Sequence, residues 1–357
     1  MFKMSITVAV TGMNARADNP GPGLAIARCL KESNTPTRVV GLGYEALDPA
    51  LYHRGFVDRG YLLPYPSHGE DALLARVCEL HEREKFDVLI PCLDAEMQSF
   101  ARLAPTLAGM GIRTFIPNSH QLALRSKDRL PELAKEIGIA SPKTQAIYQA
   151  NFFHSCQSQD WQYPLMVKGL FYDAKIAYNA EEAVAAFHRI AGEWGVPVLA
   201  QSWIGGEEIN LAGVGDGEGG LAGAVMMKKR ALTDKGKGWA GISIHDEELL
   251  AAAQKFCAVT KWRGGLELEM LRDTQGGLHL IEINPRFPAW IYLSAGVGCN
   301  LPELLVKLAL GEKLIPSTPT PAGVLFIRYA EEAIVSLADF ENITVWGETL
   351  RTEGAFA

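Results

Sequence analysis

The sequence predicts an α/β and α+β protein, with a parallel N-terminal sheet followed by a more β-rich region. Apolar strand-like runs alternate with helical segments over the first third of the chain, which is typical of a parallel sheet covered by helices. Two further apolar runs, 265–271 and 279–284, flank a turn-rich stretch and predict an antiparallel hairpin. The length of 357 residues allows two or three domains, at about 150 residues each.

The N-terminal elements follow from this alternation. A glycine- and proline-rich stretch, 12–23, separates the first strand from the first helix. It lacks G-x-G-x-x-G spacing, which disfavours a nicotinamide dinucleotide. Binding of a substrate carboxylate or phosphate at the helix N-terminus remains an open alternative. The predicted strands are 5–11, 39–42, 88–91 and 112–117, and the predicted helices are 24–32 and 70–84.

The later elements are predicted from the same patterns. Helical segments carry apolar residues on one side, whereas the strands are short apolar runs bounded by glycine, proline or polar residues. The predicted helices are 126–137, 180–193, 246–261 and 301–310. The predicted strands besides the hairpin are 164–168, 198–204, 208–213, 221–227 and 322–329.

Composition excludes several classes of protein. A net charge of −7 argues against a dedicated nucleic-acid binder. No apolar run approaches the ~20 residues that span a bilayer, and the first residues are too strand-like for a signal peptide. The six cysteines form no C-x-x-C pair, which favours reduced, buried thiols over a zinc site. We therefore expect a cytoplasmic protein without membrane or nucleic-acid partners.

The hairpin carries the most informative side chains. Glu282 and Asn284 are two residues apart, so both leave the strand on one face, and Arg286 follows two residues later. Alternation also places Glu267 and Glu269 on one face of the preceding strand. Facing carboxylates repel unless a cation lies between them, and carboxylate and amide oxygens suit Mg²⁺. A surface strand end with scattered polar residues is the alternative interpretation.

The order of these parts resembles the ATP-grasp superfamily, within it the carbamoyl-phosphate-synthetase-like and biotin-carboxylase-like carboxylate–amine ligases. The Glu-Ile-Asn-Pro-Arg segment at 282–286 and its upstream glutamate strand carry the resemblance. It implies a Rossmann-like pre-ATP-grasp domain and then the two ATP-grasp subdomains with a tail. The implied bounds are 1–120, 121–200 for the small subdomain, 201–315 for the C-terminal subdomain with the metal site, and 316–357 for the tail.

The resemblance also implies nucleotide-binding residues. Lys127 and Lys168 match the two nucleotide lysines, and Lys168 has a catalytic role because it reaches the phosphates. Glu208 matches the ribose-binding acid, although its neighbour Glu207 competes for that role. A solvated surface lysine is the alternative for each lysine, and core packing is the alternative for Trp203. The segment implied to hold adenine comprises Gln201, Ser202, Trp203 and Ile204.

By the same resemblance, Glu269, Glu282 and Asn284 bind Mg²⁺, or Mn²⁺ in its place, and bridge it to the phosphates of ATP. Arg286 is implied to stabilise the transferred phosphoryl group or the acyl phosphate. One or two of three basic residues after strand 221–227 are implied to face the γ-phosphate, although a basic surface turn is an equal alternative. These residues are Lys228, Lys229 and Arg230.

One segment departs from the family pattern. Many relatives carry a glycine-rich flap after the second lysine, but the stretch 169–175 has one glycine and two aromatic residues. Either this flap is stiffer, or the glycine-rich basic loop 233–239 closes over the phosphates.

The implied function is an ADP-forming carboxylate–amine ligase that forms a C–N bond through an acyl phosphate. An ATP-binding regulatory or scaffold protein without turnover is the first alternative, and carboxyphosphate or carbamoyl-phosphate chemistry is the second. The substrates would be a small carboxylate and an amine, such as an amino acid or peptide, and a homodimer is the family expectation. The sequence places the substrate near 94–96, where ligands gather in parallel sheets. Two roles stay open for Phe287, Trp290 and Tyr292: they form an apolar wall against the side chain of the substrate, or they pack in the core.

Overall fold

The computed structural model describes residues 5–126, 129–170, 173–233, 236–314 and 320–350. The chain divides into two compact units. The larger unit contains Met1–Leu122, Asn210–Glu267 and Ile283–Ala357, and the smaller contains Ala123–Ile209 and Leu268–Glu282. The predicted fold class, a parallel α/β sheet followed by antiparallel sheets, is confirmed.

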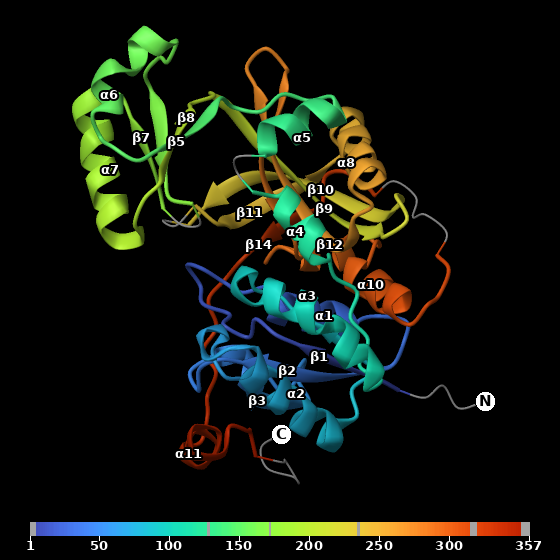
Figure 1. The fold of residues 1–357 in the computed structure, drawn as a ribbon. Helices are drawn as coiled ribbons and strands as arrows, with labels where there is room; N and C mark the ends of the chain where they lie inside the picture. Colours follow the sequence, from blue (N-terminus) through green and yellow to red (C-terminus); the bar gives the residue numbers. More distant parts are fainter. Residues whose placement is uncertain (1–4, 127–128, 171–172, 234–235, 315–319, 351–357) are drawn as a thin grey trace. The chain divides into compact units, whose positions relative to one another are not determined.

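A four-stranded parallel sheet forms the N-terminal part of the larger unit, drawn in blue to cyan in Figure 1. Alternate residues of β1 enter different cores: Val8 and Val10 pack in the cluster that includes α1, whereas Ala9 packs with α2 and α3. Helices therefore cover both faces. In the order β3-β2-β1-β4 the strands are Arg59–Leu62, Thr37–Gly43, Ile6–Val10 and Val88–Ile90. The helices are α1 (Gly23–Lys31), α2 (Glu70–Glu84) and α3 (Asp94–Gly109), with the short turns η1 (Pro49–Tyr52) and η2 (Pro66–His68).

Helix α1 also packs against a much later part of the chain. It contacts α9 (Tyr292–Gly296) and α10 (Leu301–Ala309). The Asn300 amide donates to the carbonyl of Cys29 over 2.7 Å, which fixes the start of α10 against the end of α1. The face of α1 turned away from its own sheet is therefore covered by residues that follow the hairpin.

A six-stranded sheet has the order β13-β12-β9-β10-β11-β14, with antiparallel pairing between β10 and β11 and between β11 and β14. Its strands are β9 (Gly206–Asp216), β10 (Leu221–Leu232), β11 (Gly238–Ile244), β12 (Arg263–Asp273), β13 (Leu278–Asn284) and β14 (Leu325–Ile327). Helix α8 (Glu247–Thr260) lies between β11 and β12 in the sequence, and α11 (Leu337–Trp346) follows β14. Helix α4 (Ser119–Leu124) comes before all six strands.

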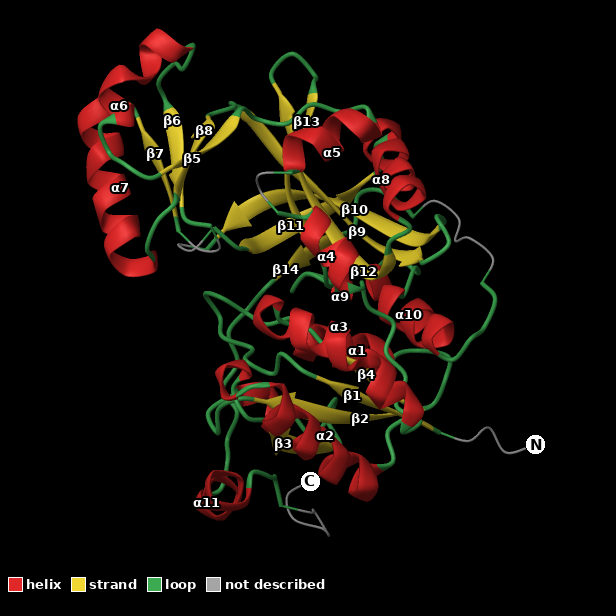
Figure 2. Ribbon diagram, viewed as in Figure 1, coloured by secondary structure: helices red, strands yellow, loops and turns green. Residues whose placement is uncertain are grey.

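The smaller unit contains a four-stranded antiparallel sheet in the order β5-β8-β6-β7. Figure 2 shows α6 and α7 along one face of this sheet, where Phe153, Phe187 and Ile190 are buried. Asn179 begins α7 by accepting from the Glu182 amide, which satisfies one of the helix's unpaired donors. The elements are α5 (Leu130–Ile137), β5 (Thr144–Ile147), α6 (Phe152–Ser155), η3 (Cys156–Gln159), β6 (Leu165–Lys168), β7 (Ala174–Ala177), α7 (Ala180–Trp194) and β8 (Val198–Ser202).

Some sequence predictions of individual elements are wrong. Residues 112–117 do not form a strand, because only Arg113 bridges to Val88. The predicted helix 126–137 is shorter and begins at Leu130, and α3 was not predicted. Among the residues that the structure describes, every helix is too short or too polar to cross a bilayer.

The junction between β1 and α1 leaves no room for a side chain at Gly23. A Cβ there would lie 2.2 Å from the carbonyl oxygen of Thr11. We therefore expect Gly23→Ala to lower the free energy of unfolding by on the order of 1–3 kcal/mol, measured by urea unfolding. Gly109, at the end of α3, is the matched control because nothing lies within 4 Å of its added Cβ. Gly109→Ala should leave the midpoint unchanged or raise it, and an equal loss in both variants would contradict the packing argument.

Candidate active site

Glu267 is the centre of a buried polar cluster in the larger unit. Its side chain on β12 is 4% exposed and accepts hydrogen bonds from three side chains. The Asn284 amide donates to Oε2 over 2.9 Å, while the Asn210 amide and the Trp290 indole donate to Oε1 over 3.0 and 2.7 Å. The predicted ligand Asn284 thus faces Glu267, the glutamate two residues before the predicted Glu269.

The cluster also contains an acceptor without a partner. The Oδ1 atom of Asn210 is buried and has no hydrogen-bond partner in the structure. A buried polar atom of this kind is costly unless a bound group satisfies it. The sequence did not point to Asn210, and for Trp290 it left open an apolar wall or core packing. The signal that could have found Asn210 is its position two residues after Glu208, on the same face of one strand.

Arg286 is held by an aspartate at the start of helix α3. Its Nε and Nη2 atoms lie 2.8 and 2.7 Å from the same oxygen of Asp94, the first residue of α3. The Nη1 group donates to the carbonyl of Phe287 over 3.2 Å. The two side chains are only 16% and 29% exposed, so the guanidinium has a fixed plane. Arg286, predicted to stabilise an anion, therefore contacts Asp94, which belongs to the predicted substrate position.

Glu96, the other acid of the predicted substrate position, is fully buried. Its Oε1 accepts from the backbone amides of Cys92 and Leu93 over 2.7 and 3.0 Å and from Thr11, while its Oε2 accepts from Tyr44. Burial raises the pKa of Glu96, and these hydrogen bonds oppose the rise. Both carboxylate oxygens of Glu96 are therefore engaged within the protein, whereas Asp94 contacts Arg286.

Of the two roles left open for the aromatic residues, core packing fits the first two. Phe287 is buried in the main core of the larger unit, and Trp290 is buried against Glu267. Tyr292 instead packs against α1, where its ring lies 3.9 Å from the Arg28 guanidinium and its hydroxyl donates to Glu32. These residues therefore join the hairpin to the N-terminal sheet.

Two of the predicted nucleotide residues, Lys168 and Gln201, lie on the four-stranded sheet of the smaller unit. Lys168 ends β6, next to Leu199 of β8 and Ala174 of β7, and is half-buried. Gln201 is buried on the central strand β8, and its amide donates to the Thr144 hydroxyl over 3.0 Å. Lys127 lies outside the described residues.

The segment that follows β8 is exposed enough to take a ligand. Trp203 is 44% exposed, so core packing does not account for it. Its ring lies over Gly205, where an added Cβ would come within 2.8 Å of the indole. Ser202 and Ile204 are half-buried, and Glu207 and Glu208 are both exposed at the start of β9. The exposure of the two glutamates does not decide between them.

The two candidate lids both join antiparallel strands. The β6–β7 connection closes with a hydrogen bond from the Gly169 amide to the Asp173 carbonyl, and Asp173 pairs with Arg189 of α7. In the β10–β11 connection, the Thr233 hydroxyl donates to the carbonyl of Asp18 over 3.0 Å. Residues 171–172 and 234–235 of these loops lie outside the described residues.

The predicted metal ligands are two carboxylates and one amide. Glu269 and Glu282 belong to the smaller unit and Asn284 to the larger. Within the described ranges, no three His, Cys, Asp or Glu side chains gather as a metal site. Three oxygen-bearing side chains of the buried cluster, Glu267, Asn284 and Asn210, are joined by hydrogen bonds.

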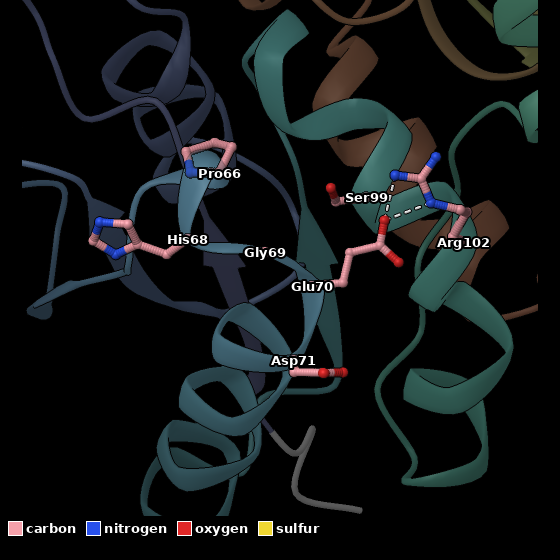
Figure 3. A pocket seen from close by; sticks show the side chains of 7 residues that line it. All are labelled: Pro66, His68, Gly69, Glu70, Asp71, Ser99 and Arg102. Atoms are coloured by element: carbon pink, nitrogen blue, oxygen red, sulfur yellow. Dashed lines mark hydrogen bonds and ion pairs between the residues drawn. The ribbon is translucent and has the colours of Figure 1, made fainter.

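A polar surface pocket of about 470 Å³ lies elsewhere in the larger unit and contains none of the predicted site residues. Figure 3 shows Glu70 of α2 and Arg102 of α3 joined across it by an ion pair, with His68 and Ser99 nearby. Both partners are partly exposed, so this pair contributes little to stability.

Comparison with protein families places the later part of the chain. Residues 196–333 match the family described as ATP-grasp in the biosynthetic pathway with Ter operon. The carbamoyl phosphate synthase large chain of Clostridium perfringens is 24% identical over 255 residues, which is 67% of this chain and 23% of the relative. The chain therefore spans about a quarter of the length of the curated relatives that it matches.

Comparison with solved structures places the whole fold. Biotin carboxylase from Campylobacter jejuni, in complex with an ATP analogue, has a TM-score of 0.67 at 16% identity and matches 88% of this chain and 72% of its own. The biotin carboxylase domain dimer of Hydrogenobacter thermophilus 2-oxoglutarate carboxylase, with MgADP and bicarbonate, has a TM-score of 0.65 at 19% sequence identity. The match covers 87% of this chain and 71% of that one. L-amino acid ligase from Bacillus licheniformis has a TM-score of 0.62 at 16% sequence identity, and the match covers 86% of this chain and 75% of that one.

The Trp290 indole can be tested as a donor to Glu267. We expect Trp290→Phe to lower the free energy of unfolding by roughly 1–3 kcal/mol, because a buried carboxylate loses a donor. Glu267→Gln removes the acceptor charge, so the double variant should be less destabilised than the sum of the single variants. Urea unfolding of all three variants measures this coupling, and strict additivity would contradict it.

Proposed function

We propose that this chain, a member of the ATP-grasp superfamily with distant similarity to carbamoyl phosphate synthase large chains and biotin carboxylase domains, forms C–N bonds between a small carboxylate and an amine. It would phosphorylate the carboxylate with ATP and release ADP and phosphate. The observation that carries this proposal is the fixed Arg286 guanidinium, beside a carboxylate–amide cluster on the neighbouring strands.

The side chains of the cluster fit a magnesium ion, or manganese in its place. Glu267 supplies a buried carboxylate and Asn210 a buried amide oxygen without a partner. Turning the Asn284 amide by half a rotation would present its oxygen where its nitrogen now donates to Glu267. Oxygen donors of this kind suit these ions. Glu282 and Asn284 are proposed as two of the metal ligands. Glu269 is proposed as the third ligand, and Glu267 is the alternative for that third position. Bound there, the ion would neutralise phosphate charge.

The nucleotide would be bound by residues of the smaller unit. Lys168 is delivered by an apolar strand and supplies a mobile positive charge for a phosphate. The exposed Trp203 offers an aromatic face to a base, and Glu208 offers a carboxylate to ribose hydroxyls. Lys127, Gln201, Ser202 and Ile204 complete the proposed nucleotide residues.

Phosphoryl transfer depends on positioning and charge neutralisation more than on a side-chain nucleophile. A carboxylate oxygen attacks the γ-phosphorus, the bond to ADP breaks, and an acyl phosphate results. The amine nitrogen then attacks the carbonyl carbon, phosphate leaves with the bonding electrons, and the proton that the nitrogen loses passes to the departing phosphate or to water. The planar fork of Arg286 suits the charge on the transferred group.

The first test concerns the metal. We expect Glu282→Gln to lower ATP turnover by on the order of 10²-fold or more, because a charge contact in the transition state is lost. Turnover is measured as ADP release at several magnesium concentrations, with a panel of carboxylates and amines that includes amino acids and peptides.

Glu218→Gln, on an exposed turn after β9, is the control and should retain full turnover. Near-normal turnover in Glu282→Gln would rule out the metal assignment. Comparing Glu267→Gln with Glu269→Gln then decides which glutamate is the third ligand, since only the ligand's variant should need more magnesium.

The second test concerns the intermediate. With hydroxylamine in place of the amine, we expect the carboxylate to be trapped as a hydroxamate, with ADP and phosphate formed in equal amounts. Arg286→Lys should lower the rate more than nucleotide affinity, because a point charge replaces a planar fork. Release of AMP and pyrophosphate would instead demonstrate adenylation.

Bicarbonate belongs in the same panel. One similar structure contains bicarbonate with MgADP, which favours carboxyphosphate chemistry as the second candidate function. ATP turnover that requires bicarbonate and no other carboxylate would support this candidate. ATP binding without turnover across the whole panel would indicate a regulatory or scaffold protein.

A further inference from the structure

We propose that Asp94 is a positioning residue that orients Arg286 for its work on the transferred phosphoryl group. This inference rests on the proposed function of Arg286. It assigns a role to the N-terminal sheet, because Asp94 follows β4 and opens α3, 192 residues before Arg286 in the sequence.

The geometry of the pair supports orientation rather than simple charge balance. One carboxylate oxygen of Asp94 accepts from both Nε and Nη2, at 2.8 and 2.7 Å. The third contact, from Nη1 to the Phe287 carbonyl, comes from the residue next to Arg286 itself. Three contacts on three nitrogens determine both the position and the plane of a rigid guanidinium group.

Asp94 is itself held rigidly. The buried Glu96 accepts from the amides of Cys92 and Leu93, which precede Asp94, and from Thr11 at the end of β1. The backbone that carries Asp94 is therefore attached to the core of the sheet. A rigid support matters because displacing a catalytic group by about 1 Å can lower a rate by roughly 10²-fold.

The exposure of the pair separates it from an ordinary surface ion pair. Arg286 is 16% exposed, whereas Arg102, which pairs with Glu70 across the pocket in Figure 3, is 50% exposed. Arg102 lies eight residues after Asp94 on α3, which is about 12 Å along the helix axis. The Glu70–Arg102 pair, which joins α2 to the same helix α3, is therefore a suitable control.

The kinetic test uses Asp94→Ala, Asp94→Asn and Glu70→Gln, with the acceptors found by the ADP-release panel. We expect Asp94→Ala to lower kcat by roughly 10- to 100-fold while the KM for ATP stays within about twofold. Asp94→Asn keeps an acceptor oxygen and should recover part of the loss, and Glu70→Gln should match the wild type. In an Arg286→Ala background, Asp94→Ala should have no further effect on kcat. Equal losses in both backgrounds would overturn the positioning role.

A second measurement does not depend on turnover. The Nε–H signal of Arg286 in a ¹⁵N-arginine spectrum, assigned by its loss in Arg286→Lys, should be protected from solvent exchange. Protection should be lost in Asp94→Ala and retained in Glu70→Gln. An unchanged signal in Asp94→Ala would overturn the inference even if the enzyme is active. Loss of protection in an enzyme without turnover would support the orientation of Arg286 and count against the proposed function alone.

Discussion

A single buried carboxylate holds the N-terminal sheet and its functional edge together. Glu96 receives hydrogen bonds from Thr11 after β1, from Tyr44 after β2, and from the backbone between β4 and α3. Burying a carboxylate is unfavourable unless donors surround it, so these four groups must remain in place together. The direction of the first turn of α3 is therefore set from inside the protein, and the position of Asp94 and then of Arg286 follows from it.

The spacing of the sequence was informative where periodicity alone decides geometry. Alternation along β13 placed Asn284 toward the preceding glutamate strand, and the structure joins Asn284 to Glu267. Periodicity could not choose between Glu267 and Glu269, because both have the same parity on β12 and the choice depends on the register of the hairpin. The pairing of Arg286 with Asp94 could not be predicted from the sequence, because 192 residues separate them and only the tertiary fold brings them together.

Other predictions failed where a local pattern had two physical meanings. The apolar run 112–117 has the composition of a strand, but Arg113 makes only one bridge to Val88, and the run continues as an irregular segment. Aromatic residues after the hairpin could line a site or fill a core, and burial of Phe287 and Trp290 shows that these two fill the core. Helix α3 contains Pro105 in its interior, which obscures its helical pattern in the sequence, although the acidic residues of its first turn are typical of a helix start.

The packing of α1 against α9 and α10 has a consequence during synthesis of the protein on the ribosome. Helix α1 ends at Lys31, whereas α9 begins at Tyr292, so the covering helices are translated on the order of tens of seconds later. During that interval the outer side of α1 exposes apolar residues that the finished protein buries. A nascent chain in this state is a natural client for a ribosome-associated chaperone, and slow codons placed between these segments would lengthen its exposure.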